Sequence, residues 1–227
     1  MARHSAKRAL APVAPGDFIP IAEASDLIVP IGAWIIRQAC RTTVDRLNDA
    51  TISVKVSPRQ FRDPNLLSNI RTALDETGLP PSRLELEITE GILIDDDQLA
   101  LRLLSTIRQL GIRIALDDFG SGYSSLSYLT RFCFDTIKID RSFVQSTDEK
   151  AWHVIRSVVS MAEALGASVV AEGVETAEQM HRLASEGCHE IQGFFIARPT
   201  PVDEISPNLP ADAQHALLAI QKKRMVA

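Results

Sequence analysis

Residues 112–126 read IRIALDDFGSGYSSL, an apolar run that ends in two neighbouring aspartates and continues into a turn rich in glycine and serine. The apolar run predicts a buried strand from Ile112 to Phe119. Just upstream, apolar residues at helical spacing predict an amphipathic helix that Gly111 ends: Leu99, Leu103, Ile107 and Leu110. A helix that leads directly into a buried strand is typical of an α/β protein.

The same alternation extends outward in both directions. Six apolar or β-branched runs predict strands, and most are separated by amphipathic helical stretches. These runs cover Ile52–Ser57, Leu84–Thr89, Ile112–Phe119, Thr136–Asp140, Ser168–Val174 and Glu190–Arg198. A further helix is expected at Ile31–Leu47, after a connection at Gly16–Ala24. Strands separated by helices need crossover connections, so we expect a mainly parallel sheet, either open or closed into a barrel.

The placement of acidic residues favours the barrel. Such residues lie in or at the ends of different predicted strands: Glu87, Asp117, Asp118, Asp140 and Glu172. In an α/β barrel the carboxyl ends of the strands converge on one mouth, where active sites are built. We therefore expect these side chains to face one mouth.

Several of these charges fall within apolar runs. Glu87 and Glu172 need a metal ion or a cationic partner there, because an unpaired buried charge is costly. Lys138 either points into the mouth or faces solvent. The pair Asp117 and Asp118 also has two interpretations: a capped loop start, or two carboxylates that reach two cations, or one cation and a water, as in two-metal phosphodiester hydrolysis.

The composition of the 227 residues indicates one large globular domain, with 45% hydrophobic and 23% charged residues. A net charge of −5 gives no general electrostatic reason to bind a nucleic acid polymer or an anionic membrane. The three cysteines are widely separated, which favours reduced thiols and a cytoplasmic location. No apolar run approaches the roughly 20 residues of a membrane span, so no membrane segment is expected.

Several motifs, in order, resemble the EAL phosphodiesterase family from its third barrel strand to its end. They read ELEITE (85–90), DDFGSGYSSLSYL (117–129), KIDRSF (138–143), VVAEGVET (169–176) and QGFFIARP (192–199), with GDFIPIAE (16–23) upstream. The resemblance implies a modified eight-stranded, TIM-like α/β barrel that hydrolyses cyclic di-GMP to pGpG with two Mg²⁺ or Mn²⁺ ions. It divides the chain into a non-matching segment 1–15, a partial EAL domain 16–205, and a C-terminal helix and tail 206–227.

The resemblance also implies roles for individual residues. The metal ligands would be Glu87, Asp117, Asp118 and Glu172, and the catalytic groups would be Lys138, Glu172 and Asp118, with Lys138 orienting the water. Ligand-binding positions would be Asp140, Glu175 and Gln192, and the loop after the two aspartates would be positioned by Glu90 and Ser124.

Two departures from the family pattern count against this activity. No Glu-Ala-Leu segment precedes Gly16, so strands 1 and 2 of the barrel are expected to be missing. Lys55 stands where the family has a metal-binding Asn, and an ammonium group has no lone pair to offer, which puts metal binding by this chain in doubt. If Lys55 points inward it would neutralise Glu87 and Asp117; the alternative is that it points outward.

The sequence therefore predicts an EAL-family cyclic di-GMP signalling protein whose phosphodiesterase activity is very weak or absent. The alternatives are a non-catalytic module that senses the nucleotide or binds a protein, and a truncated product with little function. The expected partners are cyclic di-GMP and, because an incomplete barrel exposes sheet edges, a second copy of the chain in a homodimer.

Overall fold

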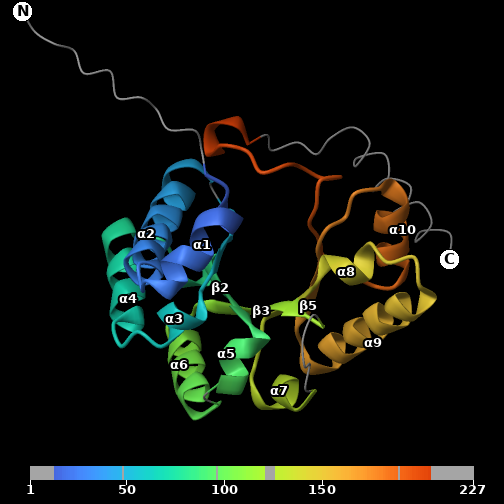
Figure 1. Ribbon diagram of the computed structural model, residues 1–227, viewed down its shortest axis with the longest axis horizontal. Helices are drawn as coiled ribbons and strands as arrows, with labels where there is room; N and C mark the ends of the chain where they lie inside the picture. The colour runs from blue at the N-terminus through green and yellow to red at the C-terminus, as the bar shows by residue number, and fades with distance from the viewer. Residues whose placement is uncertain (1–12, 48, 96, 121–125, 189, 206–227) are drawn as a thin grey trace, which may run out of the picture.

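A computed structural model of the chain describes residues 13–47, 49–95, 97–120, 126–188 and 190–205. Within them, one six-stranded sheet runs in the order β1-β2-β3-β4-β5-β6, and every neighbouring pair is parallel. The strands span Ile52–Lys55, Leu84–Thr89, Arg113–Phe119, Thr136–Ile139, Ser168–Ala171 and Glu190–Ile191. The sheet is curled into a half-barrel with helices around its outside (Figure 1). The predicted α/β barrel-like fold is confirmed, whereas the predicted loss of two opening strands stays a prediction.

Helices connect the strands as the alternation predicts. They span Pro15–Ala24 (α1), Ile28–Arg46 (α2), Pro58–Phe61 (α3), Leu66–Thr77 (α4), Glu90–Asp95 (α5), Asp97–Gln109 (α6), Leu126–Arg131 (α7), Arg141–Val144 (α8), Glu149–Leu165 (α9) and Ala177–Ser185 (α10). The helices α4 and α9 end at Gly78 and Gly166, which adopt the left-handed conformation that only glycine reaches without cost. Among the described residues, no helix combines the length and the apolar character that crossing a bilayer requires.

Several predicted elements differ from the structure. The fifth strand ends at Ala171 rather than Val174, so Glu172 follows it, and the helix predicted at Ile31–Leu47 spans Ile28–Arg46. Residues 16–24, predicted as a connection, lie in α1, because Pro15 at its start has the backbone angle that a helix needs. The sixth strand is only Glu190–Ile191 rather than a run to Arg198. Beyond it the chain turns, since the amides of Ile196 and Ala197 both bond to the carbonyl of Gly193.

The two faces of the sheet have opposite character. Side chains on the outer face join a single hydrophobic core with the helices, for example Leu86, Ile114 and Ile137. The alternate residues face the inside of the curl and are largely polar, because successive side chains of a strand point to opposite faces. This inner polar face leads to the mouth at the carboxyl ends of the strands.

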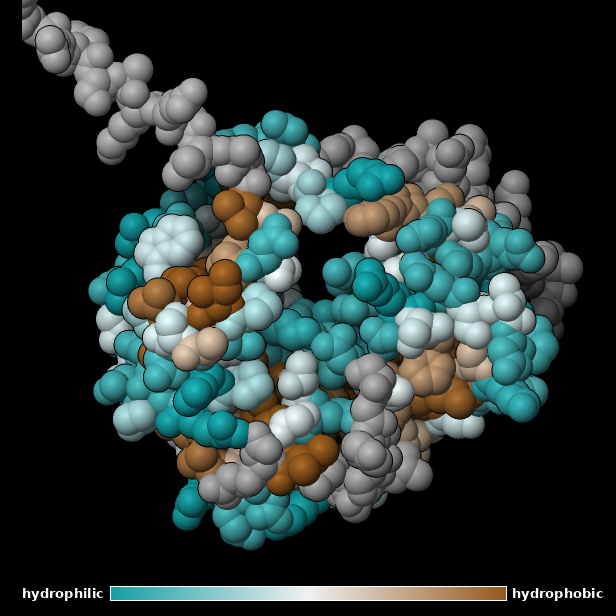
Figure 2. All heavy atoms as spheres, viewed as in Figure 1, coloured by the Kyte–Doolittle hydropathy of each residue, from teal (hydrophilic) through white to brown (hydrophobic). Residues whose placement is uncertain are grey.

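An apolar surface lies beside the open edge of the sheet. Within the described part of the chain, β1 and β6 each pair with one neighbouring strand. More than half of the large apolar side chains that are exposed in these residues lie between Val13 and Val44, in α1, α2 and their flanks. Figure 2 shows this hydrophobic area beside a central hollow lined with hydrophilic side chains.

We expect the chain to self-associate through this apolar surface, because large exposed apolar patches and unpaired strand edges favour association. Sedimentation velocity at roughly tens of micromolar protein should show dimers or larger species. The double variant Ile21→Glu and Trp34→Glu, at two largely exposed positions, should shift the distribution toward the monomer. The matched control is Val154→Glu, at an exposed position of α9. A strictly monomeric parent chain would contradict this expectation.

Candidate functional site

Six charged side chains at or near the ends of the five strands β1 to β5 meet at the mouth. Lys55 ends β1, Glu87 lies in β2, Asp117 and Asp118 lie in β3, Lys138 lies in β4, and Glu172 directly follows β5. We call these six side chains the mouth cluster. The parallel register brings them together, because each strand ends beside its neighbour at the same edge.

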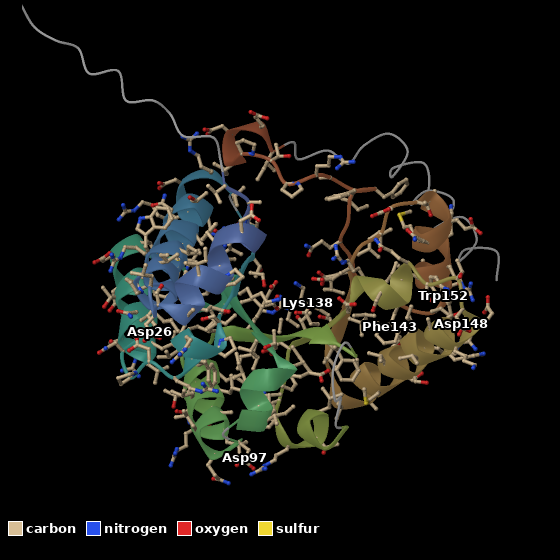
Figure 3. The ribbon with its side chains drawn as sticks, in the orientation of Figure 1. Asp26, Asp97, Lys138, Phe143, Asp148 and Trp152 are labelled. Carbon is tan, nitrogen blue, oxygen red and sulfur yellow. The ribbon has the colours of Figure 1, made fainter. Side chains whose placement is uncertain are left out.

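Lys138 is the centre of this cluster. Its Nζ lies 2.8 Å from Glu87 Oε1, 2.6 Å from Glu172 Oε1 and 3.4 Å from Asp117 Oδ1, and its side chain is only 7% exposed. Burial by itself would lower the pKa of Lys138, but the hydrogen bonds to Glu172 and Glu87 outweigh it and raise the pKa. Figure 3 shows Lys138 near the centre of the curled sheet, so the alternative of a solvent-facing lysine is wrong.

A β-bulge brings the two aspartates to the same side. Neighbouring residues of a regular strand point to opposite faces, so Asp117 and Asp118 could not otherwise share a partner. The register between β3 and β4 shifts between Leu116 and Phe119, and Asp118 has a φ of 55°. An aspartate tolerates this left-handed conformation better than most residues, and the bulge re-aims its side chain.

Lys55 bridges the two aspartates. Its Nζ lies 2.8 Å from Asp117 Oδ2 and 2.8 Å from Asp118 Oδ2. The inward orientation is therefore the one the structure has, although the partners are the two aspartates rather than Glu87, which pairs with Lys138 instead. Burial by itself would lower the pKa of Lys55, but the two hydrogen bonds outweigh it and raise the pKa.

The pKa values of two carboxylates of the mouth cluster are shifted in opposite directions. Asp117 has a side chain only 4% exposed, and burial alone would raise its pKa, yet the hydrogen bond from Lys55 and the charge of Lys138 lower it. For Glu172, burial outweighs the hydrogen bond from Lys138 and raises the pKa. One oxygen, Asp117 Oδ1, is buried and has no hydrogen-bond partner within the described residues.

The cluster has only part of what a divalent cation needs. Oxygens of Asp117, Asp118 and Glu172 all lie within 4.8 Å of one another, and carboxylate oxygens are the ligands that Mg²⁺ and Mn²⁺ prefer. The buried Asp117 Oδ1 would gain a partner from such an ion. However, Lys55 already contacts Asp117 and Asp118 and would repel the ion. As arranged, the residues do not fit a divalent cation.

The other predicted site residues lie around the mouth cluster. Glu90 Oε1 accepts a hydrogen bond of 3.1 Å from the Gly120 amide, and Ser124 lies outside the described residues. The carboxylate of Asp140 accepts a bond from the Ser142 amide at the start of α8.

Glu175 and Gln192 lie on the segments that follow β5 and β6. Glu175 accepts a hydrogen bond of 3.0 Å from Gln145. Gln192 follows β6, and its backbone bonds to Ala171 and Val174. Among the described residues, Glu175 forms no ion pair with Lys55 or Lys138.

A second layer of polar side chains lies on the same face of the sheet, two residues before the mouth cluster along the strands. It was not predicted from the sequence. Thr136 donates to Glu85 Oε2 at 2.8 Å, Ser53 donates to Glu85 Oε1 at 3.2 Å, and Arg113 lies 3.4 Å from Glu85. The sequence contained a signal for this layer. Ser53, Glu85 and Thr136 each precede a residue of the mouth cluster by two positions, and residues two apart in a strand lie on the same face. Glu85 is thereby compensated within the fold.

A groove of about 680 Å³ opens beside Lys55. It lies between α1, α2 and β1, and apolar residues such as Phe18, Ile31 and Ile35 form much of its lining. This volume falls within the usual range of small-molecule sites.

One family model and several curated proteins match the chain. The model, described as EAL domain, matches residues 2–199. The chain is 47% identical over 196 residues to an uncharacterized signaling protein of Caulobacter vibrioides, covering 86% of the chain and 24% of that protein. It is 40% identical over 202 residues to the cyclic di-GMP phosphodiesterase PdeR of Escherichia coli, covering 87% of the chain and 30% of that protein. The chain thus spans less than a third of the length of these relatives.

A solved structure has the same fold. It is described as the PaMucR phosphodiesterase in complex with c-di-GMP, and it superposes with a TM-score of 0.81 at 38% identity. The match covers 85% of this chain and 80% of that chain. The curled parallel sheet therefore corresponds to an EAL barrel.

We expect Lys138→Met to lower the free energy of unfolding by about 3–5 kcal/mol, because it leaves buried carboxylates without their cation. Lys138 has a raised pKa, so its contribution is fully present below the usual lysine value of 10.5 and is lost only as the pH rises past it. In the variant, the carboxylates must be neutralised by protons instead. The deficit should therefore be largest near pH 7 and shrink toward about pH 5.

Urea unfolding followed by circular dichroism at both pH values measures this difference. The matched control is Lys150→Met, at an exposed position of α9, which should change stability little at either pH. A deficit that is small or independent of pH would contradict the central role of Lys138.

Proposed function

This chain belongs to the EAL domain family, and we propose that its mouth binds cyclic di-GMP but hydrolyses it to pGpG very weakly or not at all. The observation that carries the proposal is the mouth cluster itself. Its carboxylates lie at the strand ends, but both of its lysines are engaged in ion pairs with them. Binding and hydrolysis therefore place different demands on the same side chains.

Three features support binding of a cyclic dinucleotide. Lys55 is 53% exposed, so one N–H of its ammonium group can reach a phosphate oxygen while the other two bond to aspartates. The groove beside Lys55 has the volume of a ligand site. Phe194, after β6, is half exposed although Arg198 lies over one face of its ring at 4.4 Å, and an exposed aromatic ring suits a guanine base.

The same contacts argue against hydrolysis. Attack on a phosphodiester needs a water whose proton is removed by a base, and a base is effective when its pKa lies near the working pH. The pKa of Asp117 is lowered by Lys55 and Lys138, so Asp117 is a poor base. The pKa of Glu172 is raised by burial, but its carboxylate is held by Lys138 at 2.6 Å and is not free to bond a water. Lys138 is held by three carboxylates and has little freedom to orient a water. We therefore propose an EAL domain that recognises the nucleotide with impaired catalysis.

Two further expectations concern the metal ions and the cellular location. The ions to test are Mg²⁺ and Mn²⁺, because the acidic cluster offers only oxygen ligands. We place the binding in the cytoplasm, which fits the three cysteines, since they form no disulfide in the described residues.

We expect the purified chain to bind cyclic di-GMP at least tenfold more tightly than linear pGpG, because only the cyclic form presents both bases in a fixed arrangement. Phe194→Ala should weaken binding by about tenfold, since stacking of one base on an aromatic ring contributes about 1–3 kcal/mol. Equilibrium dialysis with labelled nucleotide measures both affinities. Val154→Ala, an exposed apolar residue of α9, is the control and should bind like the parent. Equal affinity for the cyclic and linear forms would contradict the proposed binding of cyclic di-GMP.

We expect hydrolysis to stay near background with either Mg²⁺ or Mn²⁺, and Lys55→Asn should not restore full activity. The substitution removes one ammonium group but leaves Lys138 in its three ion pairs. While Lys138 is held in these ion pairs it cannot orient a water. Loss of one such supporting group costs on the order of a hundredfold in rate. Chromatographic detection of pGpG is the measurement, with Glu172→Ala as the blank. Clear product from the parent chain that is absent in the blank would overturn the impaired catalysis.

A further inference from the structure

We infer that the Lys55 ammonium group is the resident cation of the mouth, which holds Asp117 and Asp118 together and keeps divalent ions out. Nucleotide binding by this chain is then independent of divalent metal. The part about nucleotide binding rests on the proposed function, whereas the part about the ion stands on the geometry of this chain alone.

The position of the ammonium group is the first argument. It lies 2.8 Å from an oxygen of each aspartate, and these aspartates are two of the three residues whose oxygens gather within 4.8 Å. A divalent ion would have to approach the same oxygens to about 2.0–2.6 Å. Both cations therefore compete for one space, and an ammonium group offers a metal no lone pair.

Strand register fixes this position. Lys55 pairs with Glu87 across β1 and β2, and the amide of Val56 continues the ladder by bonding to the Glu87 carbonyl at 2.9 Å. The side chain of Lys55 therefore lies on the inner face of the curl, as that of Glu87 does. The bulge at Asp118 brings the second carboxylate to it. The contact arises from the fold and not from a chance encounter of long surface side chains.

Charge balance is the second argument. Four carboxylates of the mouth cluster share two ammonium groups, and Lys138 is already committed to Glu87 and Glu172 by its shortest contacts. Asp117, at 4% exposure, receives from Lys138 only a 3.4 Å ion-pair contact to Oδ1, and this oxygen has no hydrogen-bond partner in the part of the chain described. Lys55 thus supplies the hydrogen bond that this buried carboxylate needs.

Lys55 is half exposed, so a divalent ion from solvent can reach the aspartates and compete with its ammonium group. A divalent ion entering the mouth must either displace the ammonium group from both aspartates or bind beside its positive charge. Like charges at such short range repel each other, so either route disfavours the ion. We expect removal of the charge at position 55 to increase Mn²⁺ affinity at least tenfold, because changes in the groups around a metal site commonly alter its affinity by about that factor or more.

The test is a Mn²⁺ titration of the full chain without nucleotide, followed by electron paramagnetic resonance. Lys55→Asn and Lys55→Gln offer an oxygen in place of the charge, and Lys55→Met removes the charge alone. The two amide variants should bind Mn²⁺ at least tenfold more tightly than the parent, and the affinity of Lys55→Met should lie between that of the parent and that of the amide variants. Lys150→Asn is the control for loss of one positive charge and should match the parent.

A melting experiment gives a second readout. The parent should melt at the same temperature in EDTA and in Mn²⁺, whereas Lys55→Asn should melt lower in EDTA and recover in Mn²⁺. If a variant fails to fold, the comparison of the parent in the two buffers still decides. Parent Mn²⁺ affinity equal to that of Lys55→Asn, or a parent that EDTA destabilises, would overturn the inference.

Nucleotide binding separates this inference from the proposed function. Equal cyclic di-GMP affinity of the parent in EDTA and Mn²⁺ supports both. Affinity that requires Mn²⁺ overturns the inference but keeps the function. Absence of binding in both buffers overturns the function, and the Mn²⁺ titration then decides the inference by itself.

Discussion

Negative charge gathered at the ends of parallel strands has to be balanced within the protein, and the rest of the mouth follows from that requirement. Asp117 and Lys138 are almost fully buried, and a buried charge without a partner is costly. The chain meets the requirement with two lysines, each shared among several carboxylates rather than paired with one. Each lysine comes from a different strand, so the balance exists only when the sheet has formed and curled.

The β-bulge in β3 decides how this charge is distributed. Without it, Asp118 would point away from Asp117, and Lys55 would have a single partner. Gly120, directly after β3, has a φ of 94° and lies so close to Phe143 that a side chain there would not fit. Glu90 adds a hydrogen bond to the Gly120 amide. The two aspartates therefore have fixed positions, although they lie where a strand becomes a loop.

Charge balance also links the fold to the function we propose. The outer face of the sheet packs against helices and supplies the core, so the inner face can be polar at little cost to stability. A mouth that already contains its counter-charges does not need an ion to hold its carboxylates together. The contacts that balance the charge also hold Asp117 and Lys138 in ion pairs, and the impaired catalysis that we propose rests on these contacts.

The sequence by itself determined the six strands, the parallel sheet and the barrel-like fold, because hydrophobic alternation and glycine stops are local signals. It also identified the charged residues that meet at the mouth, since buried charge within apolar runs needs a partner. It misjudged residues 16–24, where Pro15 starts a helix, and the length of the last strand, where Gln192 and Phe195 bond to Val174 of a distant segment. Only the tertiary structure decided which lysine pairs with which carboxylate. Those pairings depend on strand register and on the bulge at Asp118, and both are set by hydrogen bonds between strands that lie far apart in the sequence.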